Sequence, residues 1–145
     1  MAAAPRVVWM PEGTRTEIHL GAEDTGGAFC LLVDHPPAGW SLPSHLHHGA
    51  AETIHIVQGA FEVDMEGHRI ALTAGETVHV PAETVHATAN VGDAEGRRVL
   101  VFNPAGMERF FLEAGTPTRD EPVDRAKALE AAIRHGWEFV GRPRQ

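Results

Sequence analysis

The chain has 145 residues, of which 20 are acidic and 12 are basic, so its formal net charge is −8 when histidine is neutral. A chain of this length can bury roughly 70% of the surface that it exposes when unfolded, which favours one domain over residues 1–145. The acidic balance disfavours nucleic acid and anionic membranes as partners, because like charges repel phosphate groups.

The sequence has no pattern typical of export or membrane insertion. Its first residues, MAAAPRVVWM, lack the apolar core of a secretory signal, and no apolar run approaches the ~20 residues that cross a bilayer. Cys30 is the single cysteine, so no intrachain disulfide can form, and its apolar neighbours predict a buried thiol. These features favour a cytoplasmic protein without a membrane partner.

Residues 6–103 contain short alternating or apolar segments separated by turns rich in Gly, Pro and Asp. The clearest hairpin is AFEVDMEGHRIAL, in which Phe61, Val63 and Met65 alternate with acidic residues. Further strand candidates are VVWM, TEIHL, AFCLLVD, TIHIV, ETVHV, VHATAN and RRVLVF. We predict an all-β sandwich or barrel in which about eight to ten strands close on themselves.

Residues from about 105 to 145 have helical spacing instead. The two helix candidates are MERFFLEAG and PVDRAKALEAAIRHG. In the second, Ala126, Leu129 and Ile133 share one apolar stripe. We expect this C-terminal helical extension to pack against the outside of the barrel.

Four histidines and a glutamate lie within residues 39–59, GWSLPSHLHHGAAETIHIVQG. His45 and His47 are two positions apart, so on a strand both imidazoles point to one face with Cα atoms about 6.6 Å apart. Glu52 follows at an odd offset and reaches the same face only if the chain turns, which Gly49 permits. Its carboxylate then enters an apolar interior, where a bound cation removes the cost of burying the charge.

A fourth donor comes from GETVHVPAETVHATAN, where the turn after Pro81 sets His86 at the start of a new strand. Three imidazoles and one carboxylate suit Fe, Zn, Ni, Cu or Mn, and they rarely fill an octahedral shell. The sequence therefore predicts a divalent metal site with open positions for water or substrate. Its expected ligands are His45, His47, Glu52 and His86.

Other polar residues near these ligands have simpler interpretations. His48 has the opposite strand parity to His47 and is expected to face solvent, or a group that supports the ligands, and not the ion itself. His55 and His79 lie among apolar strand residues, where a hydrogen-bonded structural histidine is the usual case. Glu76 and Glu83 lie in turns, where charged residues are usually solvated.

Three aromatic residues are candidates for shaping a pocket or packing the barrel. Trp40 precedes the ligands, and it either walls a pocket for a planar substrate or packs at the mouth of the barrel. Phe110 and Phe111 are expected to pack a helix onto the barrel.

The candidate ligands lie in two segments that resemble the two signatures of the cupin superfamily. The first signature is matched at every fixed position and interval by Gly39, His45, His47, Glu52 and Gly59. The second is matched by Gly75, Pro81, His86 and Asn90, with Glu83 where the family usually has glycine. Glycine there often serves a backbone angle that glutamate tolerates badly, so this departure concerns the turn and not a ligand.

The chain resembles small single-domain bacterial cupins of the quercetin dioxygenase-like group. This resemblance implies a cupin β-barrel, also described as a jelly roll or double-stranded β-helix, that forms a homodimer. It also implies one divalent metal, with Fe²⁺ favoured, and a dioxygenase that acts on a small enolisable or aromatic carbonyl compound. Glu52 would then serve as both ligand and proton acceptor.

Two further functions stay open at this point. Zinc in the same cage would polarise a carbonyl and support isomerase or cyclase chemistry without O2, as in the polyketide cyclases that the chain also resembles. Alternatively, the metal would only hold a small molecule in a non-catalytic binding protein. The absence of tyrosine disfavours the cupin sugar epimerases, whose general acid is typically a phenol.

Overall fold

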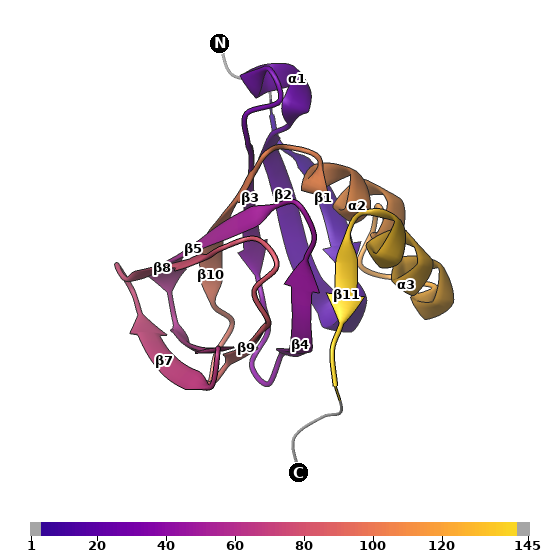
Figure 1. The fold of residues 1–145 in the computed structure, drawn as a ribbon. Coiled ribbons are helices and arrows are strands. Elements are labelled where there is room, and N and C mark those ends of the chain that lie inside the picture. The colour runs from indigo at the N-terminus through magenta and orange to yellow at the C-terminus, as the bar shows by residue number, and fades with distance from the viewer. Residues whose placement is uncertain (1–3, 142–145) are drawn as a thin grey trace.

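The computed structural model describes residues 4–141, which form two antiparallel sheets packed face to face (Figure 1). One sheet has six strands in the order β1-β2-β3-β10-β5-β8, and the other has five in the order β11-β4-β9-β6-β7. The predicted all-β jelly roll is confirmed. The described residues contain eleven strands, where we predicted about eight to ten.

The elements follow one another closely along the chain. The strands are β1 (Arg6–Met10), β2 (Thr14–Leu20), β3 (Cys30–His35), β4 (Ser41–His47), β5 (Ala51–Gln58), β6 (Ala60–Met65), β7 (His68–Thr73), β8 (Thr77–Val80), β9 (His86–Asn90), β10 (Arg97–Asn103) and β11 (Trp137–Phe139). The helices are the 3-10 turn η1 (Pro11–Gly13), α1 (Ala22–Thr25), α2 (Met107–Ala114) and α3 (Arg125–Arg134). Within residues 4–141, no helix is both long enough and apolar enough to cross a membrane.

Alternation along the strands builds the core between the sheets. On β5 the buried side chains include Ile54 and Ile56, and on β6 they are Phe61 and Val63, while the residues between them are less buried. Burying each large apolar side chain contributes about 1.5–3 kcal/mol. Cys30 is fully buried as predicted, and this burial raises the pKa of its thiol to about 11.

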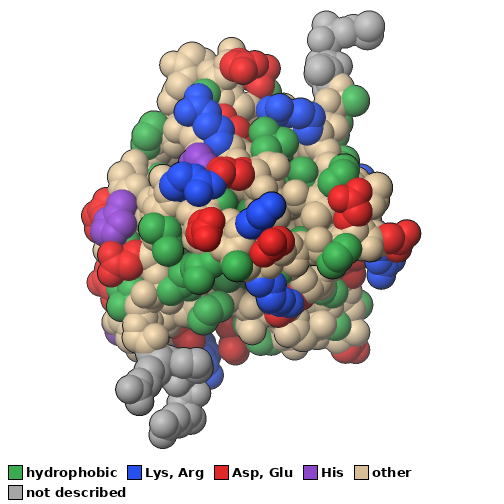
Figure 2. All heavy atoms as spheres, turned by 90° about the vertical axis from the view of Figure 1, so that its right-hand side faces the viewer, with side chains coloured by type: hydrophobic (Ala, Val, Ile, Leu, Met, Phe, Trp, Pro, Cys, Tyr) green, Lys and Arg blue, Asp and Glu red, His purple; other side chains and the backbone are tan. Residues whose placement is uncertain are grey.

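The helices pack outside the sheets as expected, but α3 uses a different face from the predicted one. Ala126, Leu129 and Ile133 are exposed. The buried side chains of α3 are Ala128, Ala131 and Ala132. The small alanine side chains at this spacing let the helix backbone lie close to the neighbouring elements. The alanine face of α3 is therefore buried, and the face with the larger apolar side chains is not. Figure 2 shows the side of the molecule that carries these helices, where apolar side chains lie among acidic and basic ones.

The C-terminal extension also contains a strand that the sequence did not predict. β11 pairs antiparallel with β4, so that Trp137 lies opposite His47 and Phe139 lies opposite His45. A segment far along the chain is therefore hydrogen-bonded beside the strand that carries two predicted ligands (Figure 1).

Candidate metal centre

Both sheets contribute to one buried cluster of polar side chains. His45 and His47 lie on β4, and His86 lies opposite His45 on the neighbouring strand β9. Glu52 lies on β5 in the other sheet. Between β4 and β5, Gly49 has a φ of 77°, which makes the turn that the odd offset of Glu52 required. The structure thus brings all four predicted ligands to the space between the sheets.

The distances within the cluster suit a shared ion. One nitrogen atom of each of the three histidines lies within 4.8 Å of the other two, and all three residues are buried. Glu52 Oε1 lies 3.3 Å from His47 Nε2 and 3.4 Å from His86 Nε2. Two ligand atoms that each bind a metal at about 2.1 Å lie roughly 3.0–3.4 Å apart in an octahedral or tetrahedral shell.

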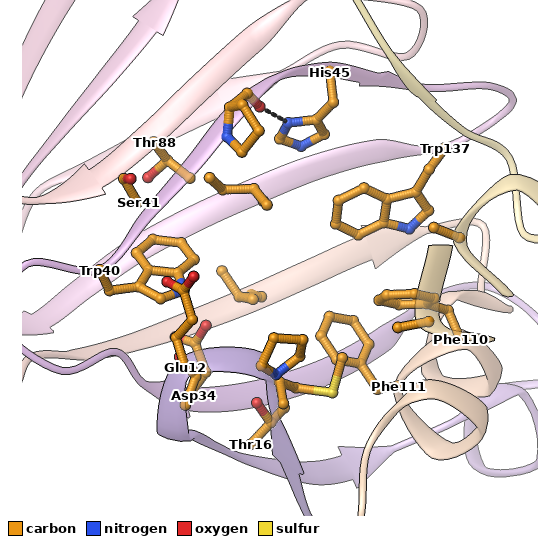
Figure 3. Close-up of a pocket in the computed structure, with 18 of the residues that line it drawn as sticks. Glu12, Thr16, Asp34, Trp40, Ser41, His45, Thr88, Phe110, Phe111 and Trp137 are labelled. Atoms are coloured by element: carbon orange, nitrogen blue, oxygen red, sulfur yellow. Dashed lines mark hydrogen bonds between the residues drawn. The ribbon is translucent and has the colours of Figure 1, made fainter. Parts of the chain in front are cut away.

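Hydrogen bonds to the backbone fix the orientation of two of the imidazoles. His45 Nδ1 donates to the carbonyl oxygen of Pro43 at 2.7 Å (Figure 3), and His86 Nδ1 donates to that of Thr84 at 3.0 Å. An imidazole that carries its proton on Nδ1 presents a lone pair at Nε2. Because both Nε2 atoms belong to one buried cluster, a cation between them would remove the repulsion of their lone pairs. The donor set therefore fits a metal.

The surroundings also set the charges of the predicted ligands. Burial, together with the nearby imidazoles of His86 and His47, lowers the pKa of His45 to about 3. Burial alone would raise the pKa of Glu52, but its close contacts with His47 and His86 outweigh burial and hold this pKa well below its usual range. Burial alone would lower the pKa of His86, but the contact with Glu52 raises it, so His86 must give up any proton on Nε2 when a metal binds. At neutral pH His45 is therefore neutral and Glu52 is ionised, which are the protonation states of metal ligands.

The third imidazole is held by packing. His47 Nδ1 is buried and makes no hydrogen bond to the residues that the structure describes. The ring packs edge-on against Trp137, with 4.6 Å between ring centroids, and against Phe102 at 5.5 Å. These T-shaped contacts orient the ring without a hydrogen bond to its second nitrogen.

A cavity of about 290 Å³ opens beside the cluster (Figure 3). The four predicted ligands line one part of it, and its walls are largely apolar and aromatic. Glu12 on η1 and Arg125 on α3 are exposed lining residues that lie 3.8 Å apart, so they mark the rim. The cluster is thus reachable by a small molecule from the side of η1 and α3.

The aromatic residues singled out in the sequence surround this cavity. Trp40 lines it, in agreement with one of its two predicted roles, and Arg98 lies over its ring at 4.7 Å. Phe110 and Phe111 are buried and pack α2 onto the sheets, as predicted. They also line the cavity (Figure 3).

Sequence reasoning missed a buried ion pair in the cavity wall. Arg98 Nε and Nη2 donate to the two carboxylate oxygens of Asp34 at 3.0 and 2.6 Å, and Arg98 Nη1 donates to the hydroxyl of Thr88 at 3.3 Å. Asp34 and Arg98 are each only 3% exposed. A signal was available, because Arg98 has the same strand parity as the inward-facing Leu100 and Phe102.

The second missed residue is Trp137 on β11. Its ring stacks on His45 with 4.9 Å between centroids and 18° between planes. Its Nε1 donates to Met107 Sδ at 3.0 Å, which ties β11 to α2. A three-residue strand is too short to show a period, but the apolar–polar–apolar order of WEF was the available signal.

Glu83 adopts a backbone angle of the kind that glycine usually serves at this signature position. Its φ is 64°, in the left-handed region that favours glycine. Its carboxylate accepts hydrogen bonds from the Gly49 N–H and from His48 Nδ1, both at 2.6 Å. His48 Nε2 lies 2.8 Å from Glu138 on β11, and the His48 side chain is 53% exposed. His48 thus faces solvent as predicted, and Glu83 also joins two turns.

The remaining candidates lie outside the cluster. His55 Nδ1 is 2.7 Å from the hydroxyl of Thr77, and His79 Nδ1 is 2.9 Å from that of Thr53. Both are therefore hydrogen-bonded histidines, as predicted. Glu76 accepts hydrogen bonds within its own turn and is exposed.

Comparison with known proteins gives the family. Residues 31–102 match the family described as the cupin domain. The chain is 30% identical over 122 residues to the quercetin 2,3-dioxygenase of Bacillus subtilis (strain 168), a match that covers 79% of this chain and 36% of that protein. The chain belongs to the cupin superfamily. This cupin is also 33% identical over 89 residues to the polyketide synthase CurC of Streptomyces cyaneus, covering 61% of the chain and 55% of CurC.

A solved structure shows the same fold. KdgF from Halomonas sp. superposes on this cupin with a TM-score of 0.64 at 20% identity, covering 71% of this chain and 89% of that one. The chain matches only about a third of the quercetin dioxygenase and about half of CurC. The predicted family is confirmed, and in this cupin the buried histidines His45, His47 and His86 form a group that could hold a metal ion.

Proposed function

We propose that this cupin is a metal-dependent dioxygenase that acts on a small enolisable or aromatic carbonyl compound. The observation that carries the proposal is a buried group of three imidazoles and one carboxylate that lines an aromatic-walled cavity. The similarity to a quercetin 2,3-dioxygenase supports oxygen chemistry.

The proposed metal ligands are His45, His47, Glu52 and His86. The same donors suit Zn²⁺, Ni²⁺, Mn²⁺ or Cu²⁺. Reaction with O2 calls for a redox-active ion, which disfavours Zn²⁺, and among the redox-active ions we favour Fe²⁺. When bound, the metal would supply Lewis acidity and a common site for substrate and O2.

Glu52 is the group placed to accept a proton from the substrate. A carboxylate is ionised at neutral pH and is a weak base compared with the carbanion of a simple ketone. A weak base removes a proton efficiently only from an acidic carbon or enol. We therefore favour a β-diketone or an enol with a neighbouring carbonyl over a simple ketone.

The cavity would position the substrate and exclude water. Trp137 and Phe110 present ring surfaces 4.9 Å apart between centroids beside the cluster, and such surfaces favour planar, apolar groups. A volume of about 290 Å³ is at the lower end for ligand pockets, which favours a small substrate.

The similarity to CurC supports a second candidate function. With zinc in the site, Glu52 would move a proton while the substrate isomerises or cyclises, and O2 would not be consumed.

The predicted homodimer stays a proposal, which light scattering on the purified chain would test.

The decisive experiment compares oxygen consumption with substrate conversion. Protein loaded anaerobically with Fe²⁺ would be mixed with β-diketones and flavonols in an oxygen electrode. We expect O2 and substrate to disappear in equal amounts, and Glu52→Gln to lower the rate by about 10²–10⁴-fold. Glu76→Gln is the matched control, because Glu76 lies in an exposed turn. Conversion without O2 would favour the isomerase, and binding without conversion would contradict both enzymes.

A further inference from the structure

We propose that the end of the cavity remote from the metal cluster is a recognition site for a neutral hydroxyl group of the substrate. Thr14 and Thr16 form this site, and the paired side chains of Asp34 and Arg98 form its floor. The inference depends on the proposed function only for the chemical identity of the substrate group that binds at the metal end.

Strand register separates the two ends of the cavity. On β10, Phe102 pairs with Glu52, whereas Arg98, four positions earlier, pairs with Asp34. Asp34 pairs in turn with Thr16 on β2. Four residues of a strand span about 13 Å. A substrate that touches both ends is therefore an elongated molecule.

Two buried hydroxyl groups mark the remote end. Thr14 is 3% exposed and Thr16 is 0% exposed, and both line the cavity. Neither hydroxyl makes a hydrogen bond to the residues that the structure describes. Figure 3 shows Thr16 across the cavity from His45. Buried hydroxyls are nearly always hydrogen-bonded, so two unpartnered ones in one cavity indicate that a ligand supplies the partner.

The charges at this end select a neutral group. Arg98 and Asp34 form a two-bond ion pair whose charges cancel, and the guanidinium lies 4.7 Å from the ring of Trp40 and 5.3 Å from that of Phe61. An anionic group would meet the carboxylate of Asp34 as well as the guanidinium. A hydroxyl group can both donate to and accept from the threonine hydroxyls.

The wall between the two ends is largely apolar, with Ser41 and Thr88 as polar lining residues. Leu42, Leu100 and Phe111 line the cavity, and they offer no hydrogen bond to the middle of a substrate. The substrate class that fits is therefore an enolisable β-dicarbonyl joined through an apolar or aromatic spacer to an alcohol or phenol.

The test compares three probes that differ at one position. Benzoylacetone, its para-hydroxy analogue and its para-carboxylate analogue would be titrated calorimetrically into the full-length protein without oxygen, once metal-free and once loaded with Zn²⁺. We expect the para-hydroxy probe to bind at least about tenfold more tightly than benzoylacetone. The para-carboxylate probe should bind more weakly than the para-hydroxy probe.

Conservative variants assign the preference to the two hydroxyls. Thr14→Val and Thr16→Val, which keep the side-chain shape, should each reduce the preference for the para-hydroxy probe, and the double variant should abolish it. Thr16→Ser, which keeps the hydroxyl, should retain it. Thr77→Val is the matched control, because Thr77 is exposed on β8 of the same sheet. Without ligand, Thr14→Val and Thr16→Val should each also raise the thermal midpoint by about 2–4 °C, since an unpartnered buried hydroxyl is removed, whereas Thr77→Val should not.

Several results would overturn the inference. These are equal affinities of wild-type protein for benzoylacetone and its para-hydroxy analogue, a preference that survives in the double valine variant, tighter binding of the carboxylate probe, or no binding of any probe. Failure of the dioxygenase proposal would look different, because O2 consumption would be absent while the hydroxyl preference remained.

Discussion

The two ends of the cavity hold their polar groups in opposite ways. At the metal end, His45 and His86 each use one nitrogen on a backbone carbonyl and keep the other free. At the remote end, Asp34 and Arg98 use their hydrogen-bonding groups largely on each other. The free nitrogen atoms at the metal end need an external cation. The charges of Asp34 and Arg98 at the remote end already cancel each other. Removing a predicted metal ligand should therefore cost ligand binding, whereas breaking the Asp34–Arg98 ion pair should cost stability.

The largest expected effect is on folding, from breaking the buried ion pair. Asp34→Ala leaves the guanidinium of Arg98 buried without its partner and should lower the free energy of unfolding by about 3–5 kcal/mol. Urea unfolding of the metal-free protein measures this change in the free energy of unfolding. The double variant Asp34→Leu with Arg98→Met should recover most of the loss, because no unpaired charge remains. A loss below about 1 kcal/mol in the single variant would remove the contrast between the two ends.

The next effect is on metal binding. His86→Ala or His47→Ala should lower metal affinity by about 100-fold or more, because one of four donors is lost. Elemental analysis and competition with a chelator measure this. The control is His48→Ala, whose side chain faces solvent beside the cluster. Equal losses in all three variants would mean that the ligand set is wrong.

A smaller effect is expected at the turn that follows β8. Glu83→Ala keeps a left-handed backbone angle on a residue with a Cβ and also removes the hydrogen bonds to Gly49 and His48. Glu83→Gly loses the same hydrogen bonds, but glycine has no Cβ, so the left-handed backbone angle is no longer strained. Thermal unfolding should therefore rank wild type first, Glu83→Gly second and Glu83→Ala third. The reverse order of the two variants would show that the angle costs nothing here.

The smallest effect concerns pH and lies on the outer side of β2. Burial alone would raise the pKa of Glu17, but hydrogen bonds from His19, His35 and Arg15 lower it from 4.5 to about 2. A carboxyl group with a depressed pKa stabilises the fold above its unfolded pKa, and this contribution is lost as the pH falls from about 4.5 to about 2.

Glu17→Gln tests this pH dependence. The variant should be less stable than wild type at neutral pH, by at most about 1 kcal/mol because its partners Arg15 and His19 are exposed to solvent, which screens these interactions. The difference should vanish near pH 2. Urea titrations at several pH values measure it, and a difference that does not change with pH would contradict the assignment.

The metal end could be predicted from the sequence because its geometry is largely local. His45, His47 and Glu52 lie on two consecutive strands joined by one turn, so strand parity and Gly49 were enough to place them. His86 followed from the turn after Pro81, which sets it at the start of a strand, and the resemblance to the cupin signatures supported the same set. Spacing within short segments thus carried most of the information.

The remote end could not be predicted in the same way. Thr16, Asp34 and Arg98 come from three strands that lie side by side only because of strand order and register. Parity shows that each side chain points inward but not which ones meet. The same limit explains the error on α3, because the period of Leu129 and Ile133 predicts a helix but not the side that faces the protein.

The position of β11 ties the completeness of the chain to the integrity of the metal centre. A chain interrupted before Trp137 would leave β4 with unpaired backbone groups on one side and would uncover the ring of His45. Unpaired strands of this kind recruit strands from other molecules. Premature termination should therefore yield aggregates and not a weakened protein, so that only chains translated through Phe139 can shield the ligands.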